Sequence, residues 1–100
     1  MAYRLRLSAR AVREVGEAYE WYEAQSQGLG SEYEAAIELQ LRRLEQAPLL
    51  YAEVLPGVRR TLLPRFPYGV FFTVSGDLLY ILAVIHNARN PARWPSRQSR

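Results

Sequence analysis

The spacing of apolar residues changes along the chain and marks out its first elements. Residues 3–7 alternate apolar and charged side chains, which is typical of a half-buried strand. From Ala9 to about Ser26 the apolar residues recur at intervals of three and four, so a helix is expected there, with Ser8 as its N-cap. The expected apolar stripe of this helix consists of Val12, Val15, Tyr19 and Tyr22.

A second helical pattern follows a short link that contains Gly28 and Gly30. Residues 31–34, Ser-Glu-Tyr-Glu, have the form of a capping box, so the second helix is expected to begin there and to end before Pro48. Its expected apolar stripe consists of Tyr33, Ala36, Ile37, Leu41 and Leu44. Because the link is short, the two helices are expected to form an antiparallel hairpin.

The pattern then changes to the period of two that is typical of strands. Strands are predicted over residues 58–63 and 68–74, followed by a tight turn at 75–77 and a central strand over 78–85, which is apolar on both faces. The predicted order is strand, helix, helix, strand, strand, strand. This order predicts a single α+β domain over residues 1–100, with the helical hairpin on one face of a small, mainly antiparallel sheet and the other face free to bind a partner.

The composition excludes several kinds of chemistry. The chain has no cysteine, which excludes disulfides, thiolate metal sites and a cysteine nucleophile. A single histidine without cysteine is no metal-ligand pattern, so neither a metal nor another cofactor is expected. No apolar run is long enough to cross a bilayer and the first residues show no apolar signal core, so a soluble, cytoplasmic protein is expected.

Charge is unevenly distributed along the sequence. All thirteen basic residues are arginine; residues 1–55 carry six of them with nine glutamates, and residues 56–100 carry seven with one aspartate. The second half, which ends in a basic tail over 93–100 that is expected to be flexible, is therefore the candidate surface for nucleic acid or an acidic protein segment. In the first half, Arg10–Glu14 and Arg13–Glu17 have the i,i+4 spacing of surface ion pairs.

Several local stretches resemble the RelE/ParE toxin superfamily of bacterial type II toxin–antitoxin systems. They are Trp21-Tyr22 with Gly28-Leu29-Gly30, Pro48 with Tyr51, Arg59-Arg60, Arg65-Phe66-Pro67-Tyr68, and Ala83-Val84-Ile85-His86 with Arg89, Pro91 and Trp94. The resemblance implies a small toxin of a plasmid stabilisation module, held by a cognate antitoxin in a hetero-oligomer. It also implies one of two targets, because the ParE-like branch poisons DNA gyrase and the RelE-like branch cleaves messenger RNA on the ribosome.

The residues expected of a RelE-like nuclease are incomplete in this sequence. Such enzymes use a Lys/Arg cluster, an arginine directly after the tyrosine of the third strand, and a C-terminal tyrosine or histidine. Here Gly69 follows Tyr68, lysine is absent, and no tyrosine follows Tyr80. The favoured hypothesis is therefore a ParE-like inhibitor of gyrase that performs no chemistry of its own.

Two alternatives stay open from the sequence. One is a ribosome-dependent, metal-independent endoribonuclease that uses Arg65, His86 and Arg89, although a histidine held by backbone hydrogen bonds at a strand end is the simpler interpretation of His86. The other is a member that is no longer toxic. The residues expected to bind a target or the antitoxin are Arg59, Arg60, Arg65, Phe66, Tyr68, His86, Arg89, Arg93 and Trp94.

Overall fold

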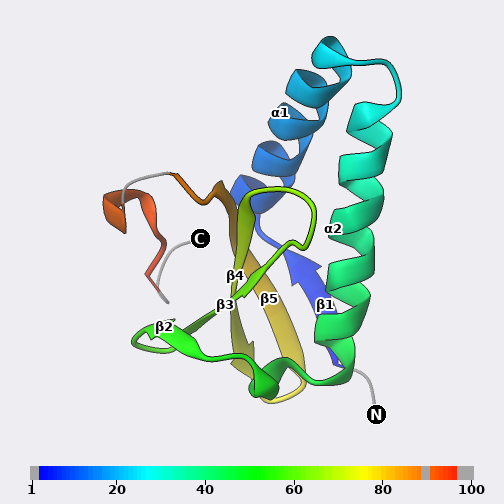
Figure 1. Ribbon diagram of the computed structural model, residues 1–100. Helices are drawn as coiled ribbons and strands as arrows, with labels where there is room; N and C mark the ends of the chain where they lie inside the picture. The colour runs from blue at the N-terminus through cyan, green and yellow to red at the C-terminus, as the bar shows by residue number, and fades with distance from the viewer. Residues whose placement is uncertain (1–2, 89–90, 97–100) are drawn as a thin grey trace.

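A helical hairpin covers one face of a five-stranded sheet in the computed structural model, which describes residues 3–88 and 91–96 (Figure 1). The elements are β1 (Arg4–Leu7), α1 (Ala9–Gln25), α2 (Leu29–Gln46), the 3-10 turn η1 (Pro48–Leu50), β2 (Glu53–Leu55), β3 (Val58–Leu62), β4 (Tyr68–Ser75), β5 (Leu78–His86) and the 3-10 turn η2 (Pro91–Arg93). The strand order is β1-β5-β4-β3-β2. β1 runs parallel to β5, and all other neighbours are antiparallel.

This architecture confirms the predicted α+β class and the predicted helical hairpin. It adds one strand that the sequence pattern did not predict, β2, which pairs with the start of β3. β2 has three residues and is followed directly by Pro56, so it is too short to show an alternating pattern. The central position predicted for the strand over 78–85 is confirmed, because β5 lies between β1 and β4.

The buried face of α1 differs from the predicted stripe. Val12 is 58% exposed, and the buried residues of α1 are Ala11 and Ala18. Val15 and Tyr22 pack against the same core, so the true stripe is rotated from the prediction by about one residue. Small alanines allow the helix to approach the sheet closely, whereas a sequence pattern gives most weight to large apolar side chains.

The link between the helices is capped by a carboxylate rather than by the predicted capping box. α2 begins at Leu29, so Ser31 lies inside the helix. Glu23 accepts hydrogen bonds from the backbone amides of Gly28 and Gly30, each at 2.9 Å. Gly28 adopts a left-handed φ of 89°, and a Cβ at Gly30 would lie 2.7 Å from the Tyr19 carbonyl oxygen. Gly28 is therefore required by its left-handed backbone conformation, and Gly30 by the close approach of the two helices.

The second face of the sheet is partly covered, although it was expected to be free. Its buried residues are Val58, Phe71, Leu82, Ala83 and Ile85. The C-terminal segment lies over them, with the Trp94 ring 5.1 Å from the Phe71 ring and Pro95 buried. Residues 97–100 of the predicted flexible tail lie outside the described residues.

Candidate functional site

A groove of about 1000 Å³ runs between α1 and the last residues of β5. α1 forms one wall, and the start of β4, the end of β5 and Arg93 form the other. The lining residues are Arg10, Arg13, Glu14, Glu17, Ala18, Trp21, Tyr22, Pro67, Tyr68, Val84, Ile85, His86 and Arg93. The groove thus combines arginines, carboxylates, aromatic rings and the single histidine of the chain.

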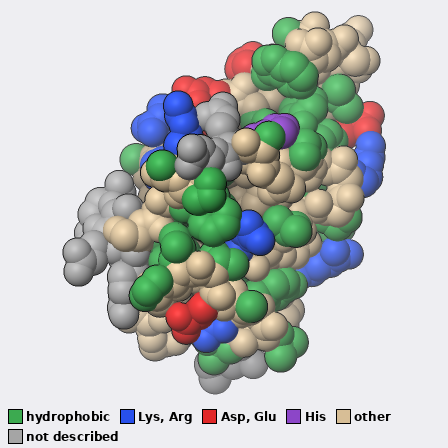
Figure 2. All heavy atoms as spheres, turned by 60° about the vertical axis from the view of Figure 1, so that its left-hand side comes forward, with side chains coloured by type: hydrophobic (Ala, Val, Ile, Leu, Met, Phe, Trp, Pro, Cys, Tyr) green, Lys and Arg blue, Asp and Glu red, His purple; other side chains and the backbone are tan. Residues whose placement is uncertain are grey.

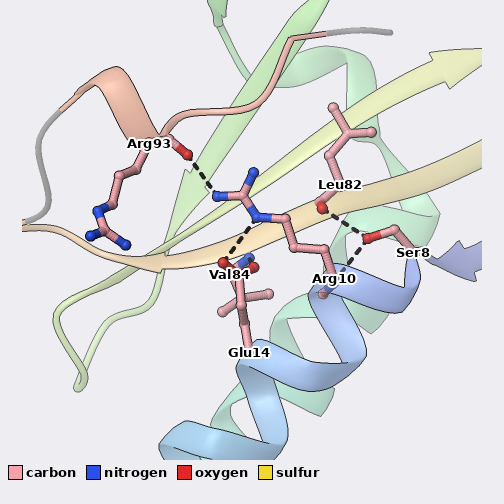
Figure 3. A network of polar contacts seen from close by, with 7 residues as sticks. Ser8, Arg10, Glu14, Leu82, Val84 and Arg93 are labelled. Carbon is pink, nitrogen blue, oxygen red and sulfur yellow. Dashed lines mark hydrogen bonds and ion pairs between the residues drawn. The ribbon is translucent and has the colours of Figure 1, made fainter. Parts of the chain in front are cut away.

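A polar network fixes the floor of this groove at the edge of β5 (Figure 3). The Glu14 carboxylate accepts a hydrogen bond from the Val84 amide at 2.8 Å and pairs with Arg10 at 3.0 Å. Arg10 also donates to the Arg93 carbonyl at 2.6 Å. Because one guanidinium joins α1 to the C-terminal segment, the network ties both walls of the groove to β5.

His86 lies at the end of β5 in this groove, where a backbone hydrogen bond holds its ring. Its Nδ1 atom accepts the Ala88 amide hydrogen at 3.0 Å, and its ring packs edge-on against Tyr68 with centroids 5.2 Å apart. With Nδ1 occupied as an acceptor, the neutral ring carries its proton on Nε2. The chain's single histidine reaches the surface, as the purple side chain in Figure 2 shows.

Arg65, a second residue of the nuclease hypothesis, does not join His86 in the groove. Arg65 is 65% exposed, pairs with Glu32 of α2 at 2.8 Å and does not line the groove. Its guanidinium lies over the ring of Phe66, which is itself buried in the helix-side core. The position of Arg89 falls outside the described residues. Phe66 therefore contributes to the helix-side core.

Arg59 and Arg60 project to opposite faces of β3. Arg59 reaches the sheet edge, where it donates to the Tyr51 carbonyl and lies 3.8 Å from Glu53 of β2. Glu53, the acidic partner of Arg59, thus belongs to the strand that the sequence pattern did not predict. Arg60 lies on the second face, with its guanidinium 5.1 Å from the Trp94 ring.

The folded chain mixes the two charge halves of the sequence. Arg65 of the basic half pairs with Glu32 of the acidic half, and Arg4 of the acidic half pairs with Asp77 in the β4–β5 turn. The Arg4 guanidinium lowers the pKa of the Asp77 carboxyl. Figure 2 accordingly shows arginines in separate groups between apolar and neutral surface. The described arginines therefore do not form one continuous basic surface on that face.

Tyr33 lies beneath the groove, packed between the rings of Tyr22, Phe66 and Tyr68. Its side chain is fully buried and, within the described residues, its hydroxyl has no hydrogen-bond partner. Burial raises the pKa of this hydroxyl above its ordinary value, and the nearby Tyr68 and Tyr22 hydroxyls raise it further. The hydroxyl therefore stays neutral and costs stability where it lies.

Replacing Tyr33 with phenylalanine is expected to raise the free energy of unfolding by about 1 kcal/mol, because it removes an unpaired buried hydroxyl and keeps the ring. Denaturant unfolding of both proteins measures the difference. A loss of stability would contradict the assignment, since it would mean that the hydroxyl has a partner in solution.

The comparison with protein families identifies the chain. The model of the ParE toxin of type II toxin–antitoxin systems, parDE, matches residues 5–91. This protein belongs to the ParE toxin family. The match extends from β1 through the start of η2, so it includes every strand, both helices and nearly all of the groove.

Solved structures share the fold of this ParE-family chain. The chromosomal ParDE system of P. aeruginosa matches with a TM-score of 0.76 and 24% identity, over 85% of this chain and 96% of that one. The RelBE2 toxin–antitoxin complex of Mycobacterium tuberculosis matches with a TM-score of 0.63 and 17% identity, over 86% and 99%. An E. coli RelE mutant in complex with a RelB peptide matches with 0.62 and 20%, over 92% and 90%. No curated protein matches the sequence.

Metal-binding clusters and membrane-spanning helices are both absent from the described residues. No group of three or more histidine, cysteine, aspartate or glutamate side chains there is placed to hold a metal ion. Neither helix of this ParE-family chain combines the length and the hydrophobicity that a bilayer span needs.

Several groove residues were missed by sequence reasoning. Arg10 and Glu14 form the predicted i,i+4 pair, but the same carboxylate also caps β5, a contact across 70 residues. No ion pair forms between Arg13 and Glu17 among the described residues. Trp21 lines the groove and is 59% exposed, but in the sequence it stood out only through the family resemblance.

Proposed function

We propose that this ParE-family toxin inhibits DNA gyrase by binding it and is neutralised by a cognate antitoxin. The observation that carries the proposal is the match to the ParE family over residues 5–91. The solved relatives support the antitoxin partner, because the ParDE and RelBE structures are named as toxin–antitoxin systems. Gyrase is the target that the ParE-like branch implies.

The geometry supports an inhibitor over a nuclease. Cleavage of RNA by its 2′-hydroxyl needs a base, an acid and cations around one phosphate. Arg65 is occupied by Glu32 outside the groove, and Nδ1 of His86 is occupied by a backbone amide. Of the described arginines that line the groove with His86, Arg10 is committed to Glu14 and the C-terminal segment, and the other two are Arg13 and Arg93.

A substitution of His86 distinguishes the gyrase inhibitor from the endoribonuclease. Asparagine at this position keeps an oxygen near the place of Nδ1, so it can accept the Ala88 amide, but it cannot transfer a proton near neutral pH. If the proposal holds, induction of the His86→Asn protein without antitoxin arrests growth and DNA replication as the parent does. A nuclease that depends on His86 would instead lose about 100-fold or more of its messenger cleavage.

The readout in cells uses pulse labelling of DNA together with reverse-transcription mapping of message ends. Early loss of DNA synthesis with intact messages supports the gyrase inhibitor. Message cuts that disappear in His86→Asn would establish the RelE-like alternative. A folded protein without growth arrest would establish the non-toxic alternative.

A further inference from the structure

The η1 turn, which connects α2 to β2 (Figure 1), presents two leucines to solvent. Leu49 is 56% exposed and Leu50 is 85% exposed, the highest fraction of any large apolar side chain in the described part of the chain. Two adjacent leucines form a continuous apolar surface, whereas an apolar residue exposed singly is ordinary. None of the described residues that line the groove comes from η1, β2 or β3, so this surface is separate from the groove.

Buried neighbours hold the η1 turn in place. Pro48, at its start, is fully buried. Tyr51, which follows the turn, packs edge-on against Phe72 of the helix-side core, with ring centroids 6.2 Å apart. The Tyr51 backbone amide also donates to the Pro48 carbonyl at 3.3 Å. Because the residues on both sides of the leucines are anchored inward, the leucines are held in their exposed positions.

Arg59 of β3 fixes the same turn from the side of the sheet. Its guanidinium donates to the backbone carbonyl of Tyr51 and, at 3.5 Å, to that of Leu49. The Arg59 side chain is only 25% exposed, so it stabilises the turn from below rather than offering its charge to a partner. A surface that is rigid before it meets its partner loses less conformational entropy on binding. The two leucines are therefore a preformed contact.

A positively charged side chain is linked to this turn by hydrogen bonds. Nε2 of Gln40 on α2 lies 3.5 Å from the Tyr51 hydroxyl, and Oε1 of Gln40 accepts a hydrogen bond from Arg43 at 3.4 Å. Arg43 lies in the last turn of α2 and forms no ion pair within the described residues, whereas Arg42 beside it pairs with Glu38. An unpaired guanidinium close to exposed leucines suits a protein surface that has an apolar pocket with a carboxylate at its rim.

We propose that Leu49, Leu50 and Arg43 form the surface by which this toxin binds the gyrase protein, with the leucines in an apolar pocket of the enzyme and Arg43 paired with an acidic group at its rim. The inference rests on the proposed function for the identity of the partner. A protein fits this surface better than DNA does, because leucine side chains neutralise no phosphate. A second copy of the chain fits it less well, because a symmetric dimer would bring two Arg43 side chains together.

Variants of the full chain test the apolar part of this surface. Leu50→Ser is expected to weaken binding to purified gyrase, measured by surface plasmon resonance, about tenfold or more, because a leucine that is buried on binding is lost. The toxin concentration that halves supercoiling is expected to rise by the same factor. The matched control is Leu62→Ser, which changes a half-exposed leucine at the end of β3 and is expected to stay within about twofold of the parent.

Charge variants test the role of Arg43. Arg43→Glu is expected to weaken binding to gyrase about tenfold or more, because it places a carboxylate opposite an acidic group. The control is Arg6→Glu, an equal change of charge at an exposed position of β1, on the other edge of the sheet from β2. Added salt is expected to weaken binding of the parent more than binding of Arg43→Ala. A role of Arg43 in folding alone would leave this salt dependence unchanged.

Two results would overturn this surface while the gyrase target stands. One is inhibition by Leu50→Ser that equals that of the parent, and the other is an equal loss of affinity in Leu62→Ser. A parent protein that neither binds nor inhibits gyrase would overturn the surface and the proposed function together. Self-association of the parent in analytical ultracentrifugation that Leu50→Ser abolishes would assign the leucines to a second copy instead. Circular dichroism verifies that each variant is folded before its affinity is compared.

Discussion

Replacing Phe72 with alanine is expected to lower the free energy of unfolding by about 3–5 kcal/mol, the usual cost of deleting a buried aromatic ring. Phe72 lies in the middle of β4, is fully buried, and packs in the core that joins the sheet to both helices. Its ring also meets Tyr51 edge-on, with centroids 6.2 Å apart. A loss of this size is a large part of the stability of a small domain, so much of the variant should be unfolded at moderate temperature.

The matched control is Leu62→Ala in the neighbouring strand β3. Leu62 is half exposed, so its truncation is expected to cost no more than about 1 kcal/mol. Urea unfolding of the two variants and the parent measures both differences. Similar losses for Phe72 and Leu62 would contradict the assignment of the helix-side core.

Replacing Ser8 with alanine is expected to cost about 2–4 kcal/mol, because one buried hydroxyl serves two backbone groups. Its oxygen accepts the Ala11 amide at 2.9 Å as the N-cap of α1, and it donates to the Leu82 carbonyl at 2.8 Å. Leu82 is the extra residue of a bulge in β5, since Phe71 pairs with Ala83 and Phe72 with Ile81. The variant therefore loses a helix cap and leaves a strand carbonyl unpaired.

Ser31→Ala is the matched control for this change. The sequence alone predicts that Ser31 caps the second helix, but in the structure it is an exposed residue inside α2. Alanine there is expected to change stability by less than about 0.5 kcal/mol, because it removes no cap and has the higher helix propensity. Thermal unfolding of the two variants distinguishes them. A loss at Ser31 as large as that at Ser8 would favour the capping box that the sequence suggested.

Most of the fold could be predicted because the local periodicity of apolar residues determines most of its helices and strands. Helices with a stripe such as Ile37, Leu41 and Leu44, and a strand as apolar as β5, are specified by residues near one another in sequence. The exceptions depend on distant contacts. β2 exists because it pairs with β3, and α2 begins early because Glu23 of the preceding helix caps it.

The candidate site was less predictable for the same reason. Glu14 acts on Val84, and Arg10 acts on the Arg93 carbonyl, across separations that no periodic pattern encodes. The basic half of the sequence suggested a binding surface, but folding pairs Arg65 with Glu32 of the acidic half. His86 was located correctly at a strand end, where a backbone amide holds its ring.

The most direct test of the central claim is a supercoiling assay with purified toxin and gyrase, run beside translating ribosomes that carry a reporter message. The proposed function predicts blocked supercoiling or trapped cleaved DNA, an intact message, and recovery of gyrase when the antitoxin is added. A message cut on the ribosome with gyrase untouched would contradict it and would assign the chemistry to the groove around His86.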